Sequence, residues 1–72
     1  MQGHNEDYSE KIRKNIKRFR KEKHLSQEKL SELVNCSREH LSRVESGKLQ
    51  LGLPLFINLA KVFEVSLDEM IL

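Results

Sequence analysis

The chain has 72 residues, a charged fraction of 33% and a net charge of +2, which fits one small domain and leaves no room for a catalytic or effector domain beside it. Its single cysteine, Cys36, excludes an intramolecular disulfide and fits a reducing compartment. The uninterrupted apolar runs reach only three residues, too few to span a membrane, and the polar, acidic start is unlike a signal peptide. We therefore expect a cytoplasmic protein.

Charge is distributed unevenly along the chain. Residues 1–24 carry eight Lys/Arg against four Asp/Glu, whereas residues 49–72 carry one against three. This polarity is expected if one surface faces phosphate groups, although a basic helix is often merely solvated. Charge therefore indicates nucleic-acid binding only when a suitable fold and base-reading residues accompany it.

Every apolar series in the chain follows helical spacing, and none predicts a strand. We expect residues 1–7 to be a flexible N-terminus. A first helix is predicted over about residues 8–22, where one apolar stripe has spacings of four, four and three: Tyr8, Ile12, Ile16 and Phe19. The remaining apolar positions belong to four shorter helical segments.

Two short helices follow, separated by a turn of about three residues. The first is predicted over residues 27–34, with Ser26 as its N-cap, and the second over residues 38–45, capped by Ser37. The second helix is expected to stop at Gly47, because glycine is the preferred residue for a left-handed C-terminal cap.

Two more helices complete the chain. Pro54 marks the first turn of a helix over about residues 53–63, and Ser66 caps a final short helix over about residues 67–71. The predicted fold class is therefore all-α, a compact five-helix bundle that forms one domain over residues 8–72.

The most informative part of the chain is residues 25–48, LSQEKLSELVNCSREHLSRVESGK, which contains the two short helices. A rigid helix pair suits the major groove of DNA when its second helix exposes hydrogen-bonding side chains. We predict base contacts from five such residues: Arg38, Glu39, His40, Ser42 and Arg43. The open alternative is that Glu39 and Arg43, at i and i+4, simply pair on the surface.

Three blocks in order, LSQEKL, SREHLSRVESGK and LAKVFEVSLDEM, resemble the phage-repressor and Cro type of helix-turn-helix domain over about residues 9–72. The resemblance implies the lambda-repressor-like DNA-binding fold, with the helix-turn-helix at about residues 27–45. It also implies a sequence-specific transcriptional regulator that binds a palindromic operator in double-stranded DNA as a homodimer, with the third helix in the major groove. Repressors, restriction-modification controllers and antitoxins share this architecture, and the residues do not separate them.

The resemblance also implies roles for positions outside the recognition helix. Contacts to DNA phosphates are implied for Ser26, Gln27, Ser37, Ser46 and Lys48. The backbone around Gly47 and basic residues of the first helix are expected to add to them. Gln27 is also expected to brace the recognition helix. Arg20 and Glu45 match a paired-charge position, which implies a partly buried salt bridge between the first and third helices.

Among the positions that depart from the family pattern, two concern helix ends. Asn35 stands where glycine is common, and Glu64 stands where glycine often ends the fourth helix. Asparagine tolerates the left-handed conformation, whereas glutamate is strained there. We therefore expect the end of the fourth helix to differ from the family pattern.

A metal site or an enzyme is not predicted. Cys36 and His40 lie at i and i+4, but the spacing matches no zinc signature, and Cys36 matches an apolar core position. No third group orients the two residues as a nucleophilic pair, and the chain has no Gly-rich phosphate loop. We expect no cofactor.

The chain has more leucines than so small a core needs, which predicts an apolar patch for self-association. We expect a homodimer through the loop before the fourth helix, the fifth helix and the C-terminus. The apolar residues there, only some of which the core can need, are Leu51, Leu55, Met70, Ile71 and Leu72. The alternative is a protein-interaction module of the same fold, an antitoxin or a regulator's partner, whose apolar surface binds another protein.

Overall fold

The structure is a computed structural model that describes residues 8–72, so the flexible N-terminus predicted for residues 1–7 lies outside the described part. The described residues form helices only: α1 (Tyr8–Glu22), α2 (Gln27–Leu33), α3 (Arg38–Ser46), α4 (Leu53–Phe63) and α5 (Leu67–Ile71). The predicted all-α class is confirmed, and the helix bounds agree with the predicted ones to within one residue. None of these helices is long and apolar enough to cross a membrane.

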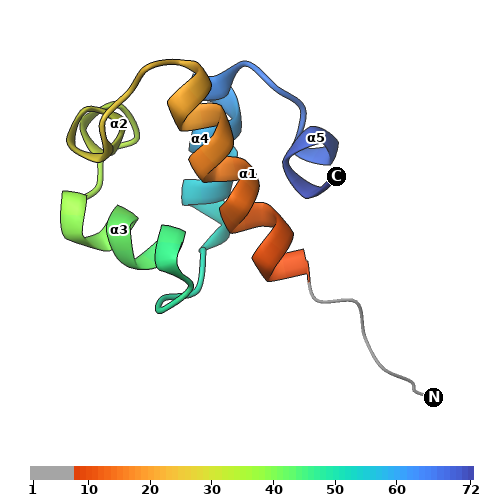
Figure 1. Cartoon of the computed structure of the whole chain (residues 1–72), viewed down its shortest axis with the longest axis horizontal. Helices are drawn as coiled ribbons and strands as arrows, with labels where there is room; N and C mark the ends of the chain where they lie inside the picture. Colours follow the sequence, from red (N-terminus) through yellow and green to blue (C-terminus); the bar gives the residue numbers. More distant parts are fainter. Residues whose placement is uncertain (1–7) are drawn as a thin grey trace.

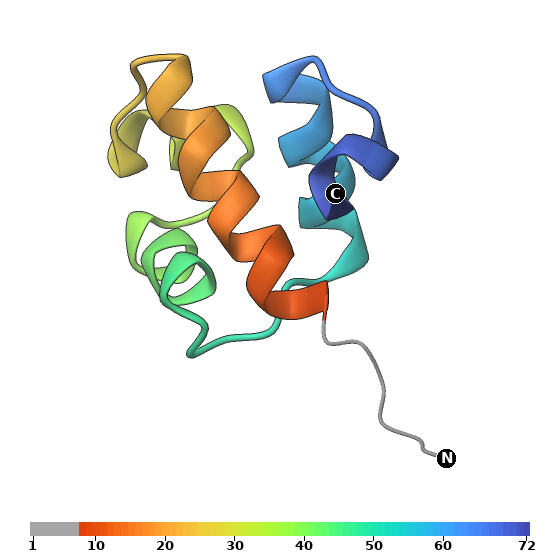
Figure 2. The ribbon, with the colours of Figure 1, turned by 45° about the vertical axis from the view of Figure 1, so that its right-hand side comes forward.

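Helix α1 is the element around which the others are arranged (Figure 1). It packs against α3, α4 and α5, while α2 packs against α3. Figure 2 shows α1 crossing the front of the molecule, with α2 and α3 on its left and α4 and α5 on its right. The helix pair α2–α3 and the C-terminal helices are therefore placed by the same long helix.

Serine caps determine where three of the helices begin. The hydroxyls of Ser26 and Ser37 accept hydrogen bonds from backbone N–H groups in the first turns of α2 and α3, at 2.9 and 3.0 Å. Ser66 forms a capping box with Glu69, in which each side chain bonds the other residue's backbone N–H. Each cap satisfies a donor that the helix leaves unpaired, which contributes about 1 kcal/mol.

The end of α4 does not differ from the family pattern, and that expectation was wrong. Glu64 adopts the left-handed conformation that a glycine would take there, with φ 61°. Its carboxylate accepts a hydrogen bond from Lys23 Nζ at 2.9 Å. This hydrogen bond, with the charge of Lys23, lowers the pKa of Glu64. Asn35 is also left-handed, with φ 65°.

The core lies where the helices meet. Its buried apolar side chains come from α1 to α5: Ile16, Leu30, Val34, Leu41, Val44, Leu59, Ala60, Phe63 and Met70. Met70 is fully buried, so it is one of the candidate interface residues that the core itself needs. Leu51 and Leu55 are half-buried and pack against this core, so much of their surface is already used within the chain.

A buried amide ties α1 to the end of α5. Asn15 of α1 donates from Nδ2 to the carbonyl oxygen of Met70 at 2.8 Å and to that of Leu72 at 3.4 Å. The last carbonyls of a helix have no partner within the helix. Asn15 therefore satisfies the end of α5 and holds this short helix against α1.

Replacing Asn15 with alanine is expected to leave the buried Met70 carbonyl without its partner. The expected cost is roughly 1–3 kcal/mol in the free energy of unfolding, the range for an unsatisfied buried group. Chemical denaturation measures it, with Asn58→Ala as the matched control, since Asn58 is exposed on α4. Equal stabilities of the two variants would contradict a structural role for the Asn15 bonds.

Candidate nucleic-acid interface

The turn between α2 and α3 is held by backbone and small side chains. The N–H of Cys36 donates to the carbonyl oxygen of Ser31 at 2.9 Å. Ser31 is itself buried, and its hydroxyl donates back to Glu28 O at 2.7 Å. A small residue at this position leaves room for α3, which packs directly against α2. The two helices therefore form one rigid unit.

The outward side of α3 carries the residues predicted to read bases. Leu41, Val44 and Glu45 face the protein and are buried. The other side presents Arg38, Glu39 and Arg43 as exposed side chains, while His40 and Ser42 are half-buried at its flanks. The structure thus brings all five predicted residues onto α3 but exposes them unequally.

Glu39 and Arg43 are paired on this surface. Arg43 Nη2 lies 3.2 Å from Glu39 Oε2, and both side chains are mostly exposed. Exposed ion pairs of this kind contribute at most about 1 kcal/mol. The pair therefore lies on the outward face, and it is weak enough for either side chain to leave it for another hydrogen-bonding partner.

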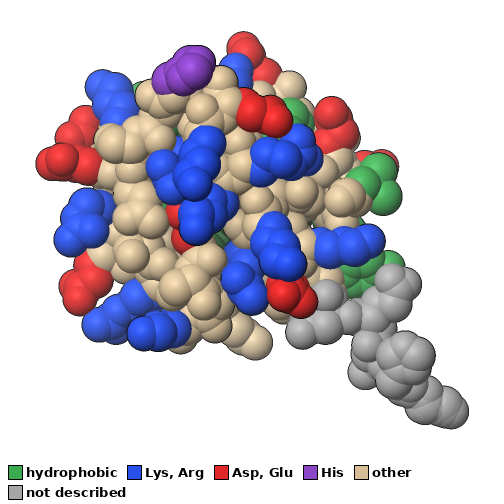
Figure 3. Space-filling model, viewed as in Figure 1, with side chains coloured by type: hydrophobic (Ala, Val, Ile, Leu, Met, Phe, Trp, Pro, Cys, Tyr) green, Lys and Arg blue, Asp and Glu red, His purple; other side chains and the backbone are tan. Residues whose placement is uncertain are grey.

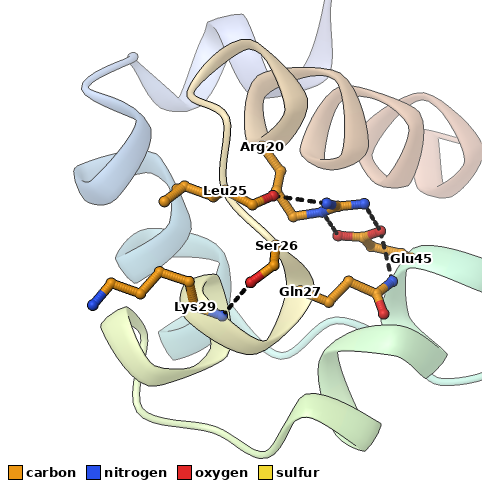
Figure 4. A network of polar contacts seen from close by, with 6 residues as sticks. All are labelled: Arg20, Leu25, Ser26, Gln27, Lys29 and Glu45. Carbon is orange, nitrogen blue, oxygen red and sulfur yellow. Dashed lines mark hydrogen bonds and ion pairs between the residues drawn. The ribbon is translucent and has the colours of Figure 1, made fainter.

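The buried polar network of Figure 4 connects α3 to the rest of the domain. Arg20 of α1 donates to both carboxylate oxygens of Glu45, from Nε at 2.8 Å and from Nη2 at 3.1 Å. Only 10% of the Arg20 side chain and 3% of the Glu45 side chain are exposed. The salt bridge that the sequence comparison implied between the first and third helices is thus present and deeply buried.

Two further hydrogen bonds complete this network. Arg20 Nη1 donates to the carbonyl oxygen of Leu25 at 2.9 Å, and Gln27 Nε2 donates to Glu45 Oε1 at 3.1 Å. Buried charges are tolerated when their remaining donors and acceptors are satisfied. Gln27 therefore braces α3 through Glu45, and this contact occupies one of its amide hydrogens.

The loop after α3 was expected to offer backbone groups to phosphate, but its N–H groups are occupied. Gly47 N–H donates to Val44 O at 3.1 Å, and Lys48 N–H donates to Arg43 O at 2.9 Å. The Ser46 hydroxyl also donates to Arg43 O, at 3.1 Å. The side chains of this loop, and not its backbone, are the groups available to an anion.

Sequence reasoning did not single out Arg13, which the structure places across this loop. A Cβ added to Gly47 would lie 3.0 Å from Arg13 Nε. No local pattern signals this contact, because the two residues are far apart in the sequence. On the face seen in Figure 3, Lys and Arg side chains gather over α1, so Arg13 is one cation among several on this helix.

The metal-site alternative gains no support from the geometry. Within residues 8–72, no three His, Cys, Asp or Glu side chains come together as a metal site would require. Burial raises the pKa of the Cys36 thiol, which disfavours the thiolate that binds metals or attacks substrates. The histidines that could have added ligands to Cys36 and His40 are His24 and His4, and His4 lies outside the described residues.

Comparison with known proteins places this geometry in a family. A helix-turn-helix family model, HTH_3, matches residues 16–70. The crystal structure of the clp gene regulator ClgR from Corynebacterium glutamicum is similar, with a TM-score of 0.83 over 93% of this chain and 71% of that chain. The sequence identity is 19%, so this likeness concerns the fold. No curated protein matches the sequence.

The buried pair is expected to be strongly coupled. Glu45→Ala leaves Arg20 as an uncompensated buried charge, at a cost of roughly 3–5 kcal/mol in the free energy of unfolding. Adding Arg20→Ala should then cost little more, which a double-mutant cycle by chemical denaturation measures. Glu32→Ala is the control, since Glu32 makes an exposed contact with Lys29 at 3.9 Å. Additive effects of the two single changes would show that the pair is not coupled.

Proposed function

Since this chain belongs to the helix-turn-helix family, we propose that it is a DNA-binding transcription regulator that recognises a palindromic operator as a homodimer. The observation that carries the proposal is the outward face of α3, which presents two exposed arginines while the buried Arg20–Glu45 pair holds the helix from behind. A helix held rigidly in this way suits insertion into the major groove. Occupancy of the operator would then regulate transcription.

The arginines of α3 are assigned to base edges. Arg38 and Arg43 lie five positions apart, about 140° around the helix, so they reach different base pairs. Each guanidinium suits bidentate bonding to guanine O6 and N7, and Glu39 suits the amino group of cytosine. His40 and Ser42, at the half-buried flanks, are assigned to bases at the edges of the contact.

Contacts to the DNA backbone are assigned to side chains around the recognition helix. Ser26 and Ser37 lie at the N-termini of α2 and α3, where N–H groups and the helix dipole favour anions. Gln27 follows Ser26 at the start of α2. Ser46 and Lys48 lie at the other end of α3. These contacts would fix the position of α3 on the duplex without reading sequence.

A homodimer accounts for the exposed leucines near α4 and α5. Leu53, Leu67 and Leu72 have exposed fractions of 64%, 42% and 81%. They replace Met70 and Leu51 as the main members of the interface we propose, because those two are needed inside the chain. Two recognition helices related by a two-fold axis would read half-sites about one DNA turn apart.

The same exposed leucines favour one other function, a module that binds another protein through its apolar surface. Salt dependence distinguishes the two functions, because binding to phosphates weakens steeply as salt rises and an apolar interface does not. Selection of bound sequences from random duplex DNA, at a stated salt concentration, tests the proposal directly. An enriched palindrome is expected; a selected pool no different from the starting pool would contradict sequence-specific binding.

Replacing Arg38 or Arg43 with alanine is expected to weaken binding to the selected site by roughly 1–3 kcal/mol and to relax preference at one base-pair position each. Each change removes a bidentate contact to a base. Anisotropy titrations on the selected site and its single-base variants measure both effects. Lys61→Ala, on exposed α4 surface, is the control. Normal binding by both arginine variants would contradict direct readout.

Changing Leu67 and Leu72 together to glutamate is expected to give a folded monomer with much weaker operator binding, because charges replace the apolar contact between subunits. Sedimentation velocity measures the mass and circular dichroism checks the fold. Leu33→Glu is the matched control, since Leu33 is an exposed leucine on α2, across the molecule from α5 (Figure 1). A mass that the double change leaves unaltered rules out this interface.

A further inference from the structure

We propose that Arg13 of α1 joins Lys48, which is already assigned to the DNA backbone, so that the two cations bind one phosphate together beside Gly47. The site rests on the proposed DNA-binding function and deepens it, because it names Arg13 as the basic residue of α1 that binds a phosphate there. Its ligand class is a phosphodiester anion, recognised by the two cations.

The close approach of Arg13 to the loop depends on the absence of a side chain at Gly47. A Cβ there would lie 3.0 Å from Arg13 Nε and 3.3 Å from Cδ, closer than ordinary van der Waals contact. Gly47 also has φ +83°, which favours glycine for a separate reason. The guanidinium of Arg13 therefore lies over the backbone that leads from Ser46 to Lys48.

The cations of this site are available to an anion. Arg13 has one ion-pair contact, with Glu10 at 3.7 Å, and its side chain remains 33% exposed. In the part of the chain that the structure describes, Lys48 takes part in no ion pair. Both line an open groove of about 820 Å³, whose apolar floor includes Ile12 and Phe56. Figure 2 shows the loop passing below the first turns of α1.

The groove is attached firmly to the recognition helix. Three groups of the loop donate to the carbonyl oxygen of Arg43: the Ser46 hydroxyl at 3.1 Å, Lys48 N–H at 2.9 Å and Leu49 N–H at 3.3 Å. The proposed site is therefore held at the last turn of α3, beside a predicted base-reading residue. A phosphate bound there would lie next to the bases that Arg43 reaches.

The position of Arg13 around α1 separates it from the other cations of this helix. Arg13 and Arg20 lie seven residues apart, about 20° from one another, so both face α3. Lys14 lies about 100° further round and is exposed. Arg18 is occupied by Glu22 at 3.2 Å and lies over the Phe19 ring at 4.4 Å from its centroid. Arg13 is thus the α1 cation that shares a groove with Lys48.

The test measures binding of the full chain to a short duplex of arbitrary sequence by fluorescence anisotropy at several salt concentrations. Loss of one phosphate contact makes the slope of log K against log salt shallower by about 0.9. We expect this change for Arg13→Gln and for Lys48→Gln. Lys14→Gln is the matched control, because it removes the same charge one residue later and its partner is also Glu10, at 3.4 Å. Its slope should stay close to that of the unaltered chain.

Equal changes of slope for Arg13→Gln and Lys14→Gln would overturn the site, since they would indicate a diffuse effect of charge. A lower melting temperature for Arg13→Gln with an unchanged slope would also overturn it, because Arg13 would then only support the end of α3. If Arg13→Gln does not fold, the test is the NMR signal of the Arg13 Nε–H group in the unaltered chain. On addition of the same duplex, this signal should shift more than the Nε–H signal of Arg18. An Arg13 signal that does not move overturns the site. Salt-independent binding by the unaltered chain would instead contradict the proposed function.

Discussion

A buried ion pair between Arg20 and Glu45 ties α3 to α1. Removing two charges from water is costly, and their attraction compensates only when the geometry is good and the remaining polar atoms are satisfied. Here the carboxylate also accepts from Gln27, and the guanidinium also donates to the carbonyl of Leu25. Apolar contacts have little direction, whereas a bidentate pair has one preferred geometry. The pair therefore adds a directional contact to the apolar packing of Leu41 and Val44, and the groups proposed to read DNA lie on the opposite side of α3.

The proposed interface has two parts, the outward face of α3 and the loop that follows this helix. The outward face of α3 carries the groups suited to base edges, and Glu39 pairs there with Arg43 at 3.2 Å in the absence of DNA. The loop at its end offers side chains only, because the N–H groups of Gly47 and Lys48 are already bonded to carbonyls of α3. Specificity would therefore come from the helix, and most of the salt-dependent affinity from the cations beside it.

The local sequence was enough to predict the helices and the composition of the recognition face. Helix starts and stops depend on residues within one turn of each other, such as Ser37 at the start of α3 and Gly47 at its end. Apolar spacing likewise shows which side of each helix is buried. The Arg20–Glu45 pair was expected from the resemblance to a known family and not from spacing, since the two residues lie on different helices. Within the candidate site, the sequence predicted which residues of α3 face outward, but not how unequally their side chains are exposed.

Only the tertiary structure decided the contacts between residues that are distant in the chain. It placed Arg13 over Gly47, buried Met70 and bonded Asn15 to the end of α5. It also kept Glu64 in the left-handed conformation that the sequence argued against, in contact with Lys23 of another segment. The energy of one residue's local conformation is small compared with the sum of packing and polar contacts around it. For this reason, local patterns determined the elements of this protein, whereas the packing of α1 against its neighbours determined which side chains share a site.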